Sequence, residues 1–193
     1  NYAFNAGYDH YALTKRQGEQ AVLGEVKNGL DAVIAVPCST VGSHGMKSHQ
    51  LNVFKSISQG KTWVYPHGGL CLTNVNDLVR GLVLCCEKGA KGERYILGGN
   101  NITYKQYFDE IAYATHGKVP GIRLPKILLT LLGFGAETLF TILKKETPVD
   151  KNVAKMISKN LFYSSELSKR ELGYTITDWR KTIRETVNQL HLN

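Results

Sequence analysis

An apolar run from Ala32 to Val36 most constrains the fold of this chain, because Asp31 precedes it and Pro37 ends it. The run is rich in β-branched residues and is flanked by breakers, so it predicts a buried strand of a parallel sheet rather than a helix. Upstream, the segment Ala12–Lys27 has the polar and apolar mixture of a helix, and Gly29 is typical of a helix C-terminus. A helix that leads into a buried strand indicates an α/β protein.

Helices and strands alternate further along the chain. A polar, glycine-containing segment from Cys38 to His49 predicts a loop at the carboxyl end of the first strand. Asn76 or Asp77 is the predicted cap of a helix over 78–87, and Thr103 that of a helix running to about 116. Further predicted helices cover 51–59 and 178–190, and further extended segments cover 63–66, 72–75, 93–97 and 122–125. Helices dominate after residue 100, which predicts half of a doubly wound sheet followed by a smaller, mostly helical lobe.

Composition and charge narrow the class of partner. The hydrophobic fraction of 42% and the charged fraction of 21% are typical of globular proteins with a buried core. A formal net charge of +8 also occurs in nucleic-acid-binding proteins, but the basic residues here are spread along the chain, so we predict no nucleic-acid partner. The densest basic stretch, Lys144–Lys159, is interpreted as a solvated face, with a phosphate-bearing substrate or an anionic membrane surface as the alternative.

The longest apolar stretch, Ile127–Leu143, is interrupted by Gly133 and Gly135 and falls short of the ~20 residues that span a bilayer. We expect a packed helix pair there, and a lid or a membrane-surface contact through 127–145 is the alternative.

Cysteine and histidine usage gives no metal signature. The 4 cysteines form no Cys-x-x-Cys pair, so we expect no metal site and a reduced, cytoplasmic protein. Cys85 and Cys86 lie in an apolar helical run, where they are expected to pack as small hydrophobic side chains. The 6 histidines are scattered, and we assign no chemistry to them.

One pair of residues has the chemistry of a proton-transfer site. Tyr11 and Lys15 stand one helical turn apart on the same face of the first helix. A free tyrosine has a pKa near ~10, and a neighbouring ammonium favours the phenolate and lowers that pKa. The pair can therefore serve as a general acid or base at a carbonyl or secondary alcohol. With 10 tyrosines in 193 residues, such a spacing arises about once by chance, so its context must support it.

The context is the strand that follows, since ligands of open α/β sheets bind beside the carboxyl ends of strands. The order of motifs resembles the extended short-chain dehydrogenase/reductase superfamily, and within it the atypical, dihydroflavonol-reductase-like branch and the hopanoid-associated sugar epimerase type. The motifs are Tyr11-x-x-x-Lys15, Ala32–Gly42, Leu72–Leu78, Gly92–Gly99, Phe162–Ser165 and Arg170–Tyr174.

This resemblance implies a function and a fold. Tyr11 would donate or accept the proton, Lys15 would also bind the cofactor ribose, and the backbone of Pro37, Cys38, Ser39 and Thr40 would contact the nicotinamide end of NAD or NADP. The fold would be α/β: the C-terminal part of a Rossmann-like doubly wound parallel sheet over 1–100, and a mostly helical substrate-binding region over 101–193. The substrate would be a small molecule, bulky or sugar-like, and the family implies a homodimer through the helix that carries Tyr11.

Some features of the family pattern are not found in this sequence. The family's glycine-rich pyrophosphate turn and its catalytic serine or threonine would lie upstream of Asn1, and Val36 stands where the family usually has arginine or asparagine. We therefore expect a C-terminal fragment that is inactive alone and belongs to an NAD(P)-dependent oxidoreductase or sugar epimerase. The alternative is a non-catalytic NAD(P)-sensing or assembly module on the same fold.

Overall fold

The α/β pattern predicted from the sequence is present in the computed structural model, which describes residues 10–42, 46, 48–125 and 159–192. The described helices are α1 (His10–Lys27), α2 (Ser48–Ser58), α3 (Val75–Lys88), α4 (Tyr104–Ala114), α7 (Glu166–Leu172) and α8 (Trp179–Gln189). The described strands are β1 (Ile34–Pro37), β2 (Ser39–Val41), β3 (Val64–Pro66), β4 (Gly69–Asn74), β5 (Arg94–Leu97), β6 (Asn100–Thr103), β7 (Ile122–Leu124) and β8 (Asn160–Leu161).

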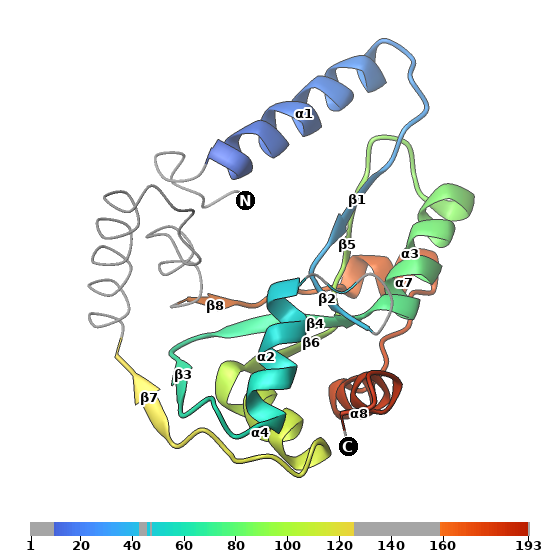
Figure 1. Ribbon diagram of the computed structural model, residues 1–193. Helices are drawn as coiled ribbons and strands as arrows, with labels where there is room; N and C mark the ends of the chain where they lie inside the picture. The colour runs from blue at the N-terminus through green and yellow to red at the C-terminus, as the bar shows by residue number, and fades with distance from the viewer. Residues whose placement is uncertain (1–9, 43–45, 47, 126–158, 193) are drawn as a thin grey trace.

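Parallel pairing dominates the described strands. β1 pairs with β5, β3 pairs with β7, and β4 pairs with both β2 and β8, all in parallel, whereas β4 and β6 are antiparallel. Figure 1 shows α1 on one side of the β1–β5 pair and α3 on the other. Helices on both sides of parallel strands are the arrangement expected of a doubly wound sheet, so the predicted fold class is confirmed.

The first strand differs from its prediction in one respect. β1 is parallel as expected, but Ile34, Ala35 and Val36 are only half-buried and Pro37 is exposed. The reason is that β1 has β5 as its one strand partner within the described residues, so that its other edge has no described neighbour. The prediction of a fully buried strand is therefore wrong for this part of the chain.

The segment after β1 is more regular than predicted. The predicted loop from Cys38 to His49 contains β2 and the first residues of α2. Ser39, Thr40 and Val41 form β2 because they pair in parallel with β4. The polar residues of this segment predict a loop, and they give no sign of this pairing.

Helix caps follow local chemistry. Thr103 caps α4 as predicted, and it forms a capping box in which its hydroxyl oxygen accepts from the backbone N–H of Gln106. The predicted cap of α3 is wrong, because Asn74 occupies that position and its side-chain oxygen accepts from the backbone N–H of Asn76 at 2.8 Å. Asp77 instead lies within the first turn of α3, where its carboxylate is buried.

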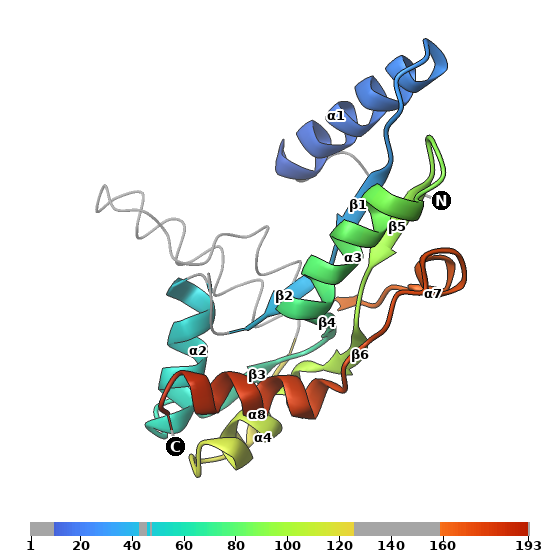
Figure 2. The ribbon, with the colours of Figure 1, turned by 90° about the vertical axis from the view of Figure 1, so that its right-hand side faces the viewer.

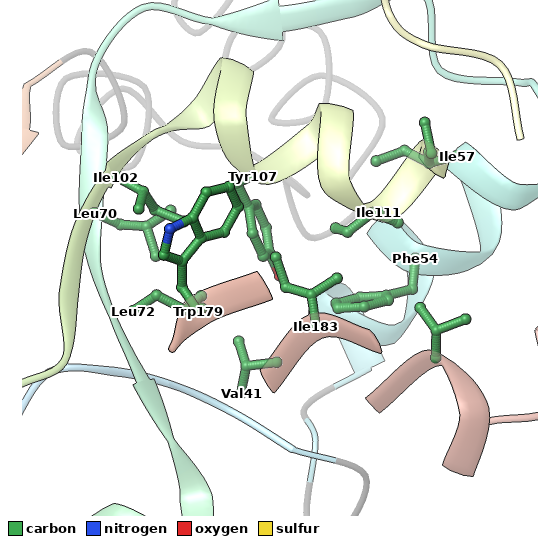
Figure 3. Close-up of a cluster of buried hydrophobic side chains, with 12 residues drawn as sticks. Val41, Phe54, Ile57, Leu70, Leu72, Ile102, Tyr107, Ile111, Trp179 and Ile183 are labelled. Carbon is green, nitrogen blue, oxygen red and sulfur yellow. The ribbon is translucent and has the colours of Figure 1, made fainter. Parts of the chain in front are cut away.

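A hydrophobic core joins the two halves of the chain. Figure 3 shows Trp179 and Ile183 of α8 beside Tyr107 and Ile111 of α4, with Phe54 of α2 at the same cluster. Since α2 precedes residue 100 and α4 and α8 follow it, this core crosses the division expected between 1–100 and 101–193. That division stays a prediction.

A second core lies under α3. It contains the buried residues Cys85, Tyr95, Leu97, Leu172 and Tyr174. The prediction that Cys85 packs as a hydrophobic side chain is confirmed. The same prediction for Cys86 is wrong, because Cys86 is exposed: successive helix residues point about 100° apart, so one of two neighbours faces away from the core.

A membrane-spanning helix and a metal site each place requirements on the described residues. Among the described helices, none combines the length and the hydropathy needed to cross a bilayer. No cluster of His, Cys, Asp or Glu suited to a metal ion occurs within 10–42, 48–125 and 159–192. The predicted contact through 127–145 lies outside the described residues.

Candidate functional site

The predicted acid–base pair lies at the start of α1. Tyr11 and Lys15 are both within this helix, one turn apart as the sequence predicts, and the Lys15 side chain is exposed. The side chain of Tyr11 lies outside the described part of the molecule.

The direction of α1 decides which end of the sheet this pair approaches. Gly29, at φ +113°, reverses the chain after α1, and the turn is held by a hydrogen bond from Leu30 N to Glu25 O at 3.0 Å. Figures 1 and 2 both show α1 running antiparallel to β1. An ion pair of 2.9 Å from Glu19 of α1 to Arg94 of β5 joins the helix to the sheet. The N-terminal end of α1 therefore faces the same side of the molecule as the carboxyl end of β1.

The carboxyl end of β1 is the point at which the chain changes its strand partner. Pro37 is still in register with Leu97 of β5, while Ser39 is in register with Leu72 of β4. Cys38 lies between these two registers, and its backbone N–H donates to Leu97 O at 3.4 Å. In an α/β sheet the carboxyl end of a parallel strand is the usual place for a ligand.

The four predicted contact residues at this end fall into two groups. Thr40 and Cys38 are engaged within the protein: Thr40 Oγ1 donates to the carbonyl oxygen of Cys38 at 3.2 Å, and Thr40 O accepts from Gln50 Nε2 at 3.2 Å. Pro37 and Ser39 are exposed. Pro37 and Ser39 are therefore the better placed of the four to meet a ligand.

By their chemistry, Lys15, Ser39 and Pro37 are candidates to hold the nicotinamide–ribose end of a dinucleotide. The Lys15 ammonium can donate to ribose hydroxyls, the Ser39 hydroxyl can donate or accept, and the Pro37 ring offers an apolar surface. Cys38 and Thr40 would support this edge from inside, through the hydrogen bonds just described.

Two cysteines meet at this edge, and sequence reasoning assigned no chemistry to the second of them. The thiol of Cys38 donates a hydrogen bond to Cys71 on β4, and Gly99 N donates to Cys71 Sγ at 3.3 Å. The Cys38 hydrogen bond lowers the pKa of Cys71 to about 7 despite burial, with help from Gly99. The same bond raises the pKa of Cys38 well above its ordinary range. The sequence alone gives no signal for this pair, because the two cysteines are brought together by the strand register, which is known only from the fold.

Two tyrosines from the C-terminal part surround the cysteine pair. Burial raises the pKa of Tyr163, and the nearby Cys38 and Cys71 add to the effect. Burial also raises the pKa of Tyr174, whose hydroxyl is buried and has no hydrogen-bond partner among the described residues. Ser165 completes this group by accepting from Gly98 N at 3.0 Å.

Comparison with known proteins matches the first half of this chain to a family model. Residues 6–98 match the model of the "NAD dependent epimerase/dehydratase family". A Synechocystis protein named for dihydroflavonol 4-reductase is 24% identical over 92% of this chain and 53% of its own length. Sterol demethylase protein B of Methylococcus capsulatus is 26% identical over 95% of this chain and 57% of its own length. The chain thus spans about half the length of the curated relatives it matches.

Solved structures share the fold. A nucleoside-diphosphate-sugar epimerase from Pseudomonas aeruginosa superimposes with a TM-score of 0.74 at 21% identity, over 99% of this chain and 58% of the other. Further structures with the same fold were solved with bound NAD or with bound NADPH. The predicted resemblance to extended short-chain dehydrogenases/reductases is confirmed.

Proposed function

We propose that the protein is an NAD(P)-dependent oxidoreductase or sugar epimerase in which Tyr11 and Lys15 carry out the proton transfer. The proposal starts from the match of residues 6–98 to the model of the NAD dependent epimerase/dehydratase family. The observation that supports this most is the antiparallel run of α1 beside β1. It brings the helix end with Tyr11 and Lys15 to the same side as Pro37 and Ser39.

Each residue has a separate task in the proposed reaction. When bound, the nicotinamide cofactor supplies hydride donor or acceptor chemistry. Tyr11 gives a proton to the substrate oxygen in reduction and removes it in oxidation. Lys15 favours the Tyr11 phenolate by its positive charge and holds the ribose by hydrogen bonding. Pro37 and Ser39 bound the nicotinamide end of the site, and the proposed substrate is a small, sugar-like or bulky molecule.

A substitution that removes one hydroxyl group tests the central role. In the full-length protein, Tyr11→Phe is expected to lower kcat by about a hundredfold or more, since a positioned general acid or base contributes about that much. Cofactor binding, measured by quenching of protein fluorescence, should change little. Tyr113→Phe is the matched control, because Tyr113 is 68% exposed on α4 and lies far along the chain from α1.

The outcomes separate the two classes of function. Full turnover by Tyr11→Phe would overturn the proposed role of Tyr11. Tight NAD(P)H binding by the wild-type protein, with no turnover of any carbonyl or sugar-nucleotide substrate, would support the non-catalytic sensing module instead.

A homodimer through α1 is part of the proposal. The family resemblance implies this dimer, and Leu13, which is 38% exposed on α1, would lie in a contact along that helix. Light scattering of the full-length protein should give twice the mass of one chain. Leu13→Asp should lower that mass to one chain, and a monomeric wild-type protein would contradict the dimer.

A further inference from the structure

Cys38 immediately precedes β2, and Cys71 lies on the neighbouring strand β4. β2 and β4 are parallel, and Ser39 is the partner of Leu72 in their register. Cys38 and Cys71 each stand one position before this first pair, and both sulfurs lie on the side of Gly98. Neighbouring strands lie about 4.8 Å apart, and a disulfide bridges Cα atoms separated by about 4.4–6.8 Å. The backbone therefore holds the two cysteines at a separation that a disulfide can span.

The sulfur atoms converge as well. A Cβ atom placed on Gly98 would lie 2.9 Å from Cys71 Sγ and 3.2 Å from Cys38 Sγ, so both sulfurs border the same small space above that glycine. Two sulfurs that border one small space can be joined by rotation of their side chains, with no change of the backbone.

The surroundings activate one sulfur and keep the other protonated. Gly99 N donates to Cys71 Sγ at 3.3 Å, and a sulfur that accepts hydrogen bonds is stabilised as a thiolate. Tyr163, Tyr174 and Arg94 are the other titratable groups whose charges act on the pair. Cys71 is 1% exposed while Cys38 is half-buried, so a small reagent suits the pair best, and Cys38 is its more accessible member.

We propose that Cys38 and Cys71 form an oxidisable thiol pair, which hydrogen peroxide converts to a disulfide. The Cys71 thiolate attacks one peroxide oxygen, the O–O bond breaks, and hydroxide leaves, which gives a sulfenic acid on Cys71. The sulfur of Cys38 then attacks the sulfur of Cys71, the S–O bond breaks, and the Cys38 proton leaves with the hydroxyl group as water. The two thiols lose two electrons and the peroxide gains them.

The other described cysteines provide the control. Cys85 is buried and Cys86 is exposed, and as neighbours on α3 they point in different directions. Cys86 tests whether exposure alone accounts for oxidation, because it is the accessible thiol without a sulfur neighbour on the same face.

The test uses the 193-residue chain, reduced and then treated with hydrogen peroxide. Free thiols are blocked with N-ethylmaleimide after denaturation, and the protein is analysed by intact mass and peptide mapping. We expect two fewer blocked cysteines, a mass loss of two hydrogens, and a linked peptide pair containing Cys38 and Cys71, all reversed by dithiothreitol. The map reads covalent state and not turnover, so its result does not depend on the proposed function.

Variants sharpen the result. Cys86→Ser should form the same link at the same rate. Cys38→Ser should leave Cys71 as a sulfenic acid that dimedone traps, and Cys71→Ser should give neither link nor adduct at Cys38. Full blocking of all four cysteines in the peroxide-treated wild-type chain, or links only to Cys85 or Cys86, would overturn the proposal. The wild-type peptide map decides the matter even if a serine variant does not fold.

Discussion

Asp77 accepts hydrogen bonds from both the backbone N–H and the side-chain hydroxyl of Thr177, at 2.6 and 2.9 Å. Asp77 also contacts Arg80 of its own helix, and its side chain is almost fully buried. This carboxylate therefore ties α3 to the segment that leads into α8. The contact spans a hundred residues of sequence.

Removing this charge should destabilise the fold. We expect Asp77→Asn to lower the free energy of unfolding by about 1–3 kcal/mol, because the partly buried donors of Thr177 lose a charged acceptor. The matched control is Asp109→Asn, since Asp109 forms an exposed pair with Lys105 and should change stability by about 0.5 kcal/mol or less. Urea unfolding followed by circular dichroism measures both. Equal effects of the two variants would contradict the role given to Asp77.

Truncating a side chain of the main core should destabilise the protein far more than truncating an exposed one. Ile183 is fully buried between α4, α2 and the sheet, as Figure 3 shows, whereas Val79 on α3 is 55% exposed. Ile183→Ala should cost about 2–5 kcal/mol through lost contacts and a cavity. Val79→Ala should cost about 0.5 kcal/mol or less, because its methyl groups are already in water. Thermal unfolding of both variants tests this, and a loss at Val79 as large as at Ile183 would show a different core.

The elements that could be predicted from the sequence are those specified by nearby residues. Thr103 and Gln106 lie within one turn of each other, so the capping box of α4 is visible in the sequence. The Tyr11–Lys15 spacing is equally local. By contrast, β2 depends on its pairing with β4, which no short segment encodes.

The cap of α3 shows why a local signal can mislead. Asn74, Asn76 and Asp77 are all residue types that cap helices. Asn74 is the cap, and Asp77 is used by Thr177, a partner that becomes visible only when the chain is folded. The Cys38–Cys71 pair escaped prediction for the same reason, since only the strand register brings the two residues together.

A close backbone approach beside the cysteine pair gives a third prediction. A Cβ atom on Gly99 would lie 1.8 Å from Leu72 O, which is backbone and cannot move aside, whereas one on Gly18 of α1 would meet nothing within 4 Å. Gly99→Ala should destabilise the protein by several kcal/mol, on the order of 3 or more, or prevent folding. Gly18→Ala should stabilise it by about 0.5–1 kcal/mol, because alanine favours a helix. A Gly99→Ala variant with wild-type stability would show that β4 and the loop after β5 are not held this closely.

The Cys38–Cys71 pair makes stability depend on pH in reducing buffer. In the folded protein the hydrogen bond from Cys38 lowers the pKa of Cys71 to about 7, from an ordinary value of 9.0. Between pH 7 and 9 the unfolded chain therefore holds a proton that the folded chain has released, and stability rises with pH by up to about 1.4 kcal/mol per unit. That contribution is complete above pH 9 and is lost as the pH falls through 7.

Cys38 gives the opposite slope at higher pH. Its pKa is raised in the folded protein, so above pH 9 the folded chain keeps a proton that the unfolded chain has released, and stability falls. The urea midpoint of the reduced wild-type protein should therefore be highest near pH 9. Cys71→Ser should remove the rise between pH 7 and 9, while Cys86→Ser should leave the profile unchanged, because the exposed Cys86 lies outside the pair. A flat wild-type profile over this range would mean that Cys71 keeps its proton in the folded protein, and that its sulfur is not the activated one.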